Sequence, residues 1–222
     1  RGLGAEQWKA LISNPRAPLV NKAVAGQYAP GSTFKMVVAL AALEKGVTTP
    51  ASRIFCSGSL KVGKAEFHCW KRGGHGDVDL IKGITQSCDV YFYEIARRTG
   101  IDRIAAMARK FGLGQVLGVD VPGEVAGLVP TREWKQATIG GTWHLGETLI
   151  AGIGQGPILV TPLQLAIMAA RLGTGRAVQP RLVQSIDETA LPFGTGAPLD
   201  VDPEHLKVVQ RAMFAVTNTK KG

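Results

Sequence analysis

A lysine inside an apolar segment, three residues after a serine, is the feature that most restricts how this chain can fold. Residues 34–44 are apolar enough to form a buried helix, and Pro30 and Gly31 mark a turn immediately before Ser32. Lys35 falls in the first turn of that helix. A buried amine costs free energy unless it is paired or used chemically, so this position predicts a functional lysine beside Ser32.

The spacing of Ser32 and Lys35 suits nucleophilic catalysis. A serine hydroxyl is a weak nucleophile until a base takes its proton, and residues three apart on a helix share one face. Burial among apolar side chains disfavours the charged form of an amine, which would make Lys35 a base. The N–H groups at the helix start favour negative charge developing near Ser32. The pattern S-x-x-K alone also fits a helix-capping serine followed by a solvated lysine, and that alternative stays open at this point.

A second polar cluster, Ser87-Cys88-Asp89, lies between two segments with helical periodicity, residues 80–86 and 90–98. A second hydroxyl and a carboxylate at such a junction favour the catalytic interpretation over the capping one. S-x-x-K, S-D-N and K-T-G together are the signature of class A β-lactamases and penicillin-binding proteins. The first two elements have counterparts in this sequence.

Further motifs in family order extend this likeness. They make the chain resemble the transpeptidase domain of class B penicillin-binding proteins, and within that group the cell-elongation type, penicillin-binding protein 2. The motifs lie within residues 21–161 and read PGSTFK, WKRGGHG, SCDVYFYEIA, GIDR, KFGLG, PTREWK and GIGQG.

The resemblance implies a mixed α/β (α+β) fold, with an antiparallel sheet between helical layers and a covered part that is mainly helical. We expect residues 1–222 to be one transpeptidase domain that is incomplete. The family's third motif, Lys-Ser-Gly or Lys-Thr-Gly on a strand, is absent from the sequence, and the final NTKKG has the wrong order for it. The N-terminal anchor and pedestal regions are also absent, so we expect a piece of a longer protein.

The resemblance also implies roles for the two polar clusters. Ser32 would be the acylated nucleophile and Lys35 its general base. Ser87 would carry a proton between Lys35 and the leaving amine. Asp89 stands where many relatives have Asn; it would orient Lys35 or the substrate amide, while its charge would favour a protonated Lys35.

Two residues are candidates for the substrate groove. Trp70 lies in a loop segment and would line the groove for the glycan–peptide strand, although loop aromatics more often serve packing. Gln155 in GIGQG would support the floor of the active site, where the neighbouring glycines permit tight turns.

The implied activity is peptidoglycan D,D-transpeptidation: stem peptides are cross-linked through a Ser32 acyl-enzyme, which β-lactams also form. The family acts in cell elongation and cell shape beside a lipid-linked glycan polymerase, with the catalytic domain in the periplasm and the anchor in the inner membrane. Two alternatives remain. One is a D,D-carboxypeptidase or β-lactamase of the same fold, and the other is a non-catalytic, zinc-stabilised scaffold.

The cysteines suggest a metal site. Cys56, Cys69 and Cys88 are the chain's three cysteines, and His75 lies among them. An odd number leaves a thiol free in an oxidising compartment, whereas three thiolates and one imidazole form the closed Cys₃His set of structural zinc. The spacing matches no compact zinc finger, so one disulfide plus a buried thiol remains an alternative. We expect structural zinc; some relatives look as though they hold a metal at matching positions. Zinc on Cys88 would fix the backbone of the second motif.

Composition limits the partners. The chain of 222 residues has a formal net charge of +9, which suits an anionic partner. The positive residues are scattered and no nucleic-acid-binding motif accompanies them, so we expect a basic surface and no nucleic acid. No stretch approaches the roughly 18 consecutive apolar residues that span a bilayer. A membrane anchor would therefore lie outside these residues.

The clearest predicted helix starts after Thr161. Thr161 can cap it, Pro162 takes the first position, Gln164 completes a capping box, and Gly173 is predicted to end it. Residues 56–79 show no period and are expected to be irregular. An extended pair with a turn at Pro180 is predicted after this helix. Further helices are predicted at residues 5–12 and 101–111, from Thr131 onward and at residues 203–216.

Overall fold

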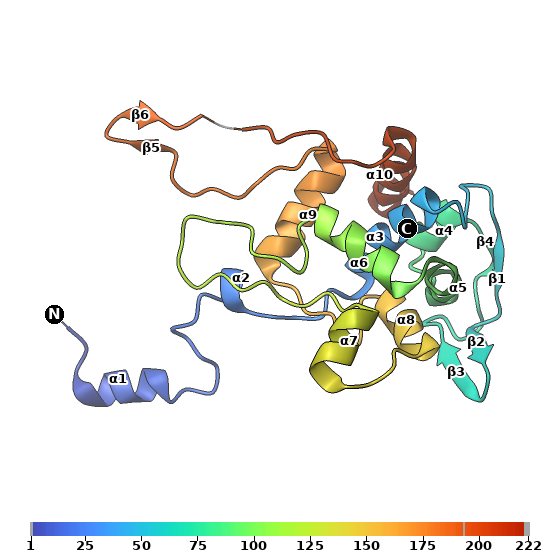
Figure 1. The fold of residues 1–222 in the computed structure, drawn as a ribbon, viewed down its shortest axis with the longest axis horizontal. Helices are drawn as coiled ribbons and strands as arrows, with labels where there is room; N and C mark the ends of the chain where they lie inside the picture. The colour runs from blue at the N-terminus through green and yellow to red at the C-terminus, as the bar shows by residue number, and fades with distance from the viewer. Residues whose placement is uncertain (1, 193, 220–222) are drawn as a thin grey trace.

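The fold is built from helices packed around one central helix, α3 (Figure 1). The computed structural model describes residues 2–192 and 194–219; Arg1 and the end of the NTKKG segment, residues 220–222, lie outside the described residues. In chain order the elements are α1 (Ala5–Ile12), α2 (Lys22–Ala25), the 3₁₀ turn η1 (Gly31–Phe34), α3 (Lys35–Glu44), β1 (Ile54–Cys56), β2 (Ser59–Val62), β3 (Ala65–His68), β4 (Gly76–Val78), α4 (Leu80–Thr85), α5 (Asp89–Thr99), α6 (Ile101–Lys110), α7 (Arg132–Ile139), α8 (Leu145–Gly152), α9 (Pro162–Thr174), β5 (Ser185–Ile186), β6 (Thr189–Ala190) and α10 (Pro203–Asn218).

Helix α3 forms the centre of the core because it is apolar on every side. All of residues 37–43 are buried, and α5, α6 and α10 pack against the helix. A helix that is apolar all round is stable only when other elements cover it. Each buried Val or Leu contributes about 1.5–3 kcal/mol. The predicted helix over residues 34–44 is confirmed, with Phe34 placed in the preceding turn η1.

Helix α1 lies apart from this core (Figure 1) and buries none of its residues. Trp8 and Ile12 are 51% and 60% exposed. The predicted bounds of this helix are confirmed. Among the described residues, no helix combines the length and apolar character that crossing a bilayer requires.

Helix α9 starts as predicted and ends later. The Thr161 hydroxyl accepts the N–H of Gln164 at 3.2 Å, and the Gln164 side chain accepts the N–H of Thr161 at 3.1 Å. Gly173 is still helical, so the predicted end is wrong. The helix stops at Gly175, whose φ of 67° is the left-handed conformation typical of a glycine after a helix.

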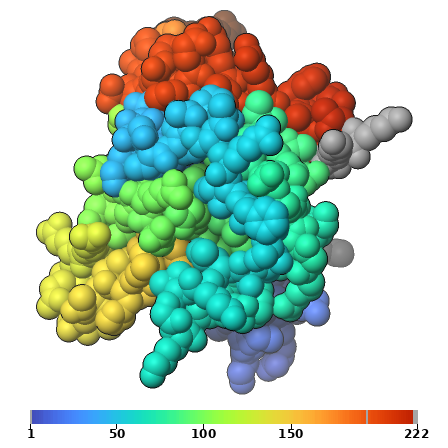
Figure 2. Space-filling model, turned by 90° about the vertical axis from the view of Figure 1, so that its right-hand side faces the viewer, coloured from blue at the N-terminus to red at the C-terminus, as the bar shows by residue number. Residues whose placement is uncertain are grey.

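The prediction that residues 56–79 are irregular is wrong. β1 pairs with β4 and β2 pairs with β3, each pair antiparallel. Strands this short do not show the alternation that would reveal them in a sequence. Figure 2 shows the segment of β1–β4 spread over the molecular surface, next to α10. The pairing places Cys56 opposite Gly76, which brings the two ends of the segment together.

The predicted turn at Pro180 is also wrong. β5 and β6 pair through Asp187 and Glu188, whose φ angles of 45° and 66° are both left-handed. Two consecutive left-handed residues form the turn that matches the natural twist of a hairpin. The turn therefore lies at Asp187 and Glu188, because these two residues adopt the left-handed conformation.

Helix α8 was missed by the sequence pattern. Gly146 and Gly152 interrupt its apolar run, and glycine weakens a helix by about 1 kcal/mol relative to alanine. Its start is stabilised by the N–H of His144, which donates to the Glu147 carboxylate at 2.7 Å. Packing against α5 stabilises the remainder of the helix.

The mixed α/β fold class is confirmed. Between residues 2 and 219, apart from residue 193, the strands form only two-stranded antiparallel pairs: β1–β4, β2–β3 and β5–β6. The larger sheet between helical layers that the resemblance implies is not among these residues. The described part is mainly helical, as predicted.

Removing the cap of α9 tests its contribution to stability. Thr161→Ala should lower the free energy of unfolding by about 1 kcal/mol, because the buried N–H of Gln164 loses its acceptor. Thr161→Ser keeps that acceptor and serves as the control. Urea unfolding followed by circular dichroism measures both variants. Equal stability of Thr161→Ala and the parent chain would contradict the assignment of the cap.

Candidate active site

Ser32 lies in the turn η1, which leads directly into α3. Gly31 has a φ of 57°, and its N–H donates to the carbonyl oxygen of Gly154 at 2.9 Å. A Cβ on Gly154 would lie 2.1 Å from the carbonyl oxygen of Gly31. The close approach of these two backbones requires glycine and fixes the position of Ser32. Gln155 also lies beside Gly31, consistent with the predicted floor of the site.

Lys35 is 1% exposed, and all three protons of its ammonium group are donated. The acceptors are the carbonyl oxygen of Ser87 at 2.9 Å, the Ser87 hydroxyl at 2.9 Å and Asp89 Oδ1 at 2.7 Å. The ring of Phe92 lies 5.5 Å from the ammonium nitrogen. A buried charge is stable only when it is paired and fully hydrogen-bonded, and this lysine meets both conditions.

Ser87 connects Lys35 to Ser32. Its hydroxyl accepts from Lys35 and donates to Ser32 Oγ at 3.0 Å. Ser87 has a φ of 51°, an uncommon conformation for a non-glycine residue that is characteristic of functional sites. Ser87 contacts both Ser32 and Lys35, whereas no direct hydrogen bond joins those two residues in the described part of the chain. This link was not predicted from the S-x-x-K spacing.

Asp89 is the first residue of α5 and is almost buried. Oδ1 accepts from Lys35, and Oδ2 accepts the main-chain N–H of Trp70 at 2.9 Å. The N-terminus of a helix favours a negative charge at this position. The prediction that Asp89 orients Lys35 agrees with this geometry, in which the two side chains form an ion pair.

Trp70 lies at the edge of the site with 63% of its surface exposed. Its indole N–H donates to the carbonyl oxygens of Gln86 and Ser87, each at 3.1 Å. The exposed ring leaves room for the predicted substrate contact. Its hydrogen bonds were not predicted, because no sequence pattern links Trp70 to the carbonyl groups at the end of α4.

The geometry joins all four predicted catalytic residues in one hydrogen-bonded chain, from Asp89 through Lys35 and Ser87 to Ser32. Such a chain can move a proton to or from Ser32 Oγ without rearrangement of the backbone. The buried ammonium stabilises negative charge that develops on Ser32. This arrangement suits nucleophilic catalysis by a serine.

The four predicted metal ligands also meet. Cys56 ends β1, Cys69 follows β3, His75 precedes β4, and Cys88 lies immediately before α5. All four are buried, and their ligand atoms lie within 4.8 Å of one another. His75 Nδ1 lies 3.6 Å from the sulfur of Cys56 and 3.5 Å from that of Cys69. Tetrahedral zinc with ordinary bond lengths separates its nitrogen and sulfur ligands by about 3.6 Å.

The chemistry of these residues fits a metal ion. Burial raises the pKa of the Cys88 thiol well above its usual value, and the neighbouring Cys56 and Cys69 raise it further. A thiol binds a metal ion as the thiolate, so metal binding would release the proton of Cys88. Burial, aided by nearby lysines, lowers the pKa of His75 and keeps the imidazole neutral, the form that binds metals. The three thiols are free, and His75 Nε2 is buried without a hydrogen-bond partner among the described residues.

Comparison with known proteins agrees with the motifs. A family model for the penicillin binding protein transpeptidase domain matches residues 5–222. The Haemophilus influenzae protein Peptidoglycan D,D-transpeptidase MrdA is 38% identical over 229 residues, covering 100% of this chain and 35% of that protein. The chain thus spans about a third of the length of its curated relatives.

Solved structures show the same fold. The crystal structure of Pseudomonas aeruginosa PBP2 in complex with WCK 5153 matches with a TM-score of 0.92 and 40% identity, covering 100% of this chain and 49% of that chain. A second match is described as structural coordination of polymerization and crosslinking by a peptidoglycan synthase complex. It has a TM-score of 0.85 and 34% identity, covering 97% of this chain and 37% of that chain.

A paired glycine experiment tests how the turn before α3 is held. Gly154→Ala should lower the free energy of unfolding by at least about 1–3 kcal/mol, because φ is 70° there and the new methyl group meets Gly31. The control is Gly173→Ala in α9, where a Cβ meets nothing within 4 Å. That change should stabilise the chain by about 0.5–1 kcal/mol. Urea unfolding that ranks the two variants in the opposite order would contradict this account.

Proposed function

Because this chain belongs to the penicillin-binding protein transpeptidase family, we propose that it carries the acylation site of a peptidoglycan D,D-transpeptidase of the elongation type. The observation that carries the proposal is the hydrogen bond from Ser87 to Ser32. Lys35 donates to the same Ser87 hydroxyl and to Asp89, so the four residues form one hydrogen-bonded chain. The names of the H. influenzae and P. aeruginosa relatives support this assignment.

The first step of the reaction is acylation. Ser32 Oγ attacks the carbonyl carbon between the two terminal D-Ala residues of a stem peptide. The new bond joins Ser32 to that carbon, the peptide C–N bond breaks, and the terminal D-Ala leaves as an amine. The Ser87 hydroxyl, which donates to Ser32 at rest, turns its O–H toward the leaving nitrogen; it then accepts the proton that Ser32 loses and gives its own proton to that nitrogen. An amine of a neighbouring stem peptide then attacks the ester, restores Ser32 and forms the cross-link.

The resting hydrogen bonds determine how Lys35 takes part. All three of its ammonium protons are donated, so Lys35 accepts the proton from Ser32 only after giving one up. Asp89 Oδ1, at 2.7 Å, is placed to receive it. With Lys35 protonated, the same contacts stabilise the negative charge on Ser32 and deliver a proton to the leaving amine. β-Lactams are attacked by Ser32 in the same way.

The partners of the whole protein belong to this proposal. The substrate is peptidoglycan, and the complex described for polymerization and crosslinking supports a lipid-linked glycan polymerase as the partner in elongation. The catalytic domain faces the periplasm, and a segment outside these residues anchors it in the inner membrane. The K[ST]G strand of the third motif, which binds the substrate carboxylate in this family, completes the site from outside these residues.

Zinc held by Cys56, Cys69, His75 and Cys88 is the second part of the proposal. The close approach of three thiols and one imidazole supports it. Zinc would supply a structural cross-link between the β1–β4 segment and the start of α5, and no step of the reaction. Its ligand Cys88 lies between Ser87 and Asp89, so loss of zinc would loosen both residues.

Intact mass spectrometry tests the nucleophile. After incubation with a simple penicillin, the protein should gain the mass of one adduct, and Ser32→Ala should gain none. The comparison is made on this chain and on a chain extended at both ends, because an adduct on the extended chain alone would show that the third motif is required. No adduct on either would overturn the enzymatic assignment and leave the scaffold alternative.

The fate of the adduct separates related activities. A transpeptidase should lose it slowly to water and faster to an amine acceptor. Rapid loss to water alone would instead identify a D,D-carboxypeptidase or a β-lactamase.

Metal analysis tests the zinc site. Purified protein should contain one equivalent of zinc, and Cys56→Ser should lose most of it and acylate more slowly, because the β1 end of the cross-link is gone. Cys56 is chosen because it is remote in sequence from Ser87. His68→Ala, an exposed histidine of β3, is the control and should keep its zinc. Protein free of zinc that shows a cysteine–cysteine bond by mass spectrometry would contradict the site.

A further inference from the structure

We propose that Trp70 is a positioning residue for acyl transfer: its indole N–H holds the carbonyl oxygen of Ser87 and so keeps the Ser87 hydroxyl between Ser32 and Lys35. The inference rests on the proposed function. It gives Trp70 a role in the reaction that does not depend on contact with substrate.

The peptide bond after Ser87 is held at both ends. The N–H of Cys88 donates to the carbonyl oxygen of Gly83 at 2.9 Å. At the other end, the carbonyl oxygen of Ser87 accepts from Lys35 at 2.9 Å and from the indole of Trp70 at 3.1 Å. Lys35 is the group proposed to transfer protons. Trp70 is the other donor to this oxygen, and its indole N–H takes no part in the proposed proton transfer.

This support matters because Ser87 is in a left-handed conformation. Its φ of 51° is one that a serine keeps only when its surroundings hold it. Relaxation of the backbone would turn the side chain away from its present direction. The Ser87 hydroxyl would then lose one or both of its contacts, to Ser32 at 3.0 Å and to Lys35 at 2.9 Å.

Trp70 supports the other partner of Lys35 as well. Its main-chain N–H donates to Asp89 Oδ2 at 2.9 Å, while Oδ1 of the same carboxylate accepts from Lys35. One residue thus contacts the two groups that bind the ammonium. No other residue among 2–192 and 194–219 donates to both Ser87 and Asp89, except Lys35 itself.

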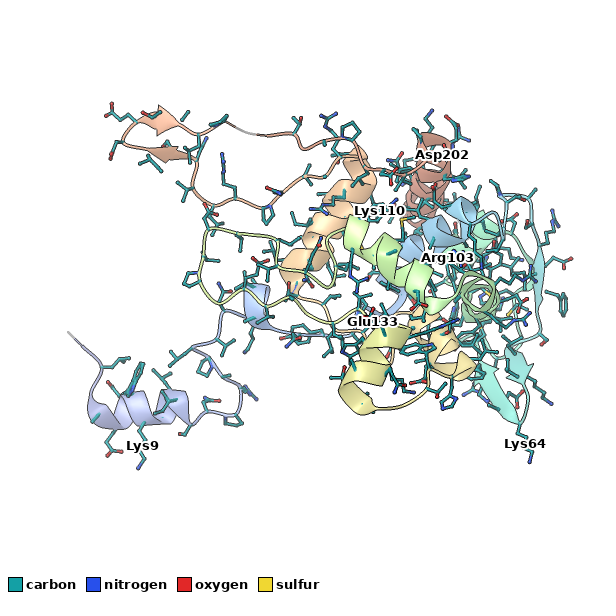
Figure 3. All side chains as sticks on the ribbon, viewed as in Figure 1. Lys9, Lys64, Arg103, Lys110, Glu133 and Asp202 are labelled. Atoms are coloured by element: carbon teal, nitrogen blue, oxygen red, sulfur yellow. The ribbon has the colours of Figure 1, made fainter. Side chains whose placement is uncertain are left out.

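The ring of Trp70 is fixed from its other side by the cysteine–histidine cluster. Trp70 directly follows Cys69, and its ring meets that of His75 edge to face with centroids 5.4 Å apart. The indole N–H is therefore aimed at the end of α4 before any substrate arrives. Figure 3 shows side chains crowded together in the β1–β4 region, with Lys64 labelled at its outer edge. Although 63% of the residue is exposed, its polar atom is already used.

Replacing the indole N–H of Trp70 while keeping the shape of the ring distinguishes a positioning role from a contact with substrate. In the full-length protein, Trp70 is replaced by 3-benzothienylalanine, which keeps the shape of the ring and has sulfur in place of the N–H group. Trp70→Phe is the genetically encoded companion variant. Acylation by a simple penicillin is followed by stopped flow, which gives the dissociation constant of the initial complex and the rate constant of acylation separately.

We expect both variants to lower the acylation rate constant about tenfold, the effect of losing one hydrogen bond. The dissociation constant should change less than about twofold for the benzothienyl variant, whose apolar surface is intact. Trp8→Phe, half-exposed on α1 and remote from the site, is the control and should keep both constants. Zinc content and thermal unfolding confirm that each variant is folded.

Two results would overturn the inference. One is a benzothienyl variant with an unchanged acylation rate constant. The other is an effect confined to the dissociation constant, which would make Trp70 a substrate contact only. Failure of the proposed function is distinguishable, because the parent protein would then form no adduct on Ser32.

Discussion

The ammonium group of Lys35 is the constraint on which the rest of the site depends. Removing a charge from water costs several kcal/mol unless partners replace the lost hydration, and α3 places this lysine at 1% exposure. All three partners come from the junction between α4 and α5: Ser87 gives two and Asp89 gives one. The junction is thus held to the start of α3, where Ser32 lies, and the proposed chemistry uses the contacts that stabilise the buried charge.

Further contacts hold the turn that carries Ser32 and the junction between α4 and α5. The Gly154 backbone fixes the turn that carries Ser32, and the β1–β4 segment reaches the junction through Cys88 and Trp70. With the role proposed for Trp70, these contacts keep Ser87 in a conformation that a serine does not favour by itself. A rigid support of this kind suits a hydroxyl that must relay a proton, because small displacements break a hydrogen bond between two oxygens.

Much of the site was accessible from the sequence, and the reasons are local. Ser32, Lys35, Ser87 and Asp89 occur in short motifs, and the helices around them have strong periodicity or caps, as with Thr161 at the start of α9. The elements that the sequence did not predict depend on contacts between distant residues. Strands β1–β4 are too short to show a period and form only by pairing with one another. Helix α8 forms by packing against α5 despite its glycines.

The sequence by itself determined the buried helix, the lysine within it, the order of the motifs and the residue types of the proposed metal site. These depend on spacing along the chain and on side-chain chemistry. Only the tertiary structure decided that Lys35 reaches Ser32 through Ser87, that Trp70 donates to the end of α4, and that Cys56, Cys69, His75 and Cys88 meet. Such contacts join residues far apart in sequence, and their geometry exists only once the core has fixed the elements that carry them.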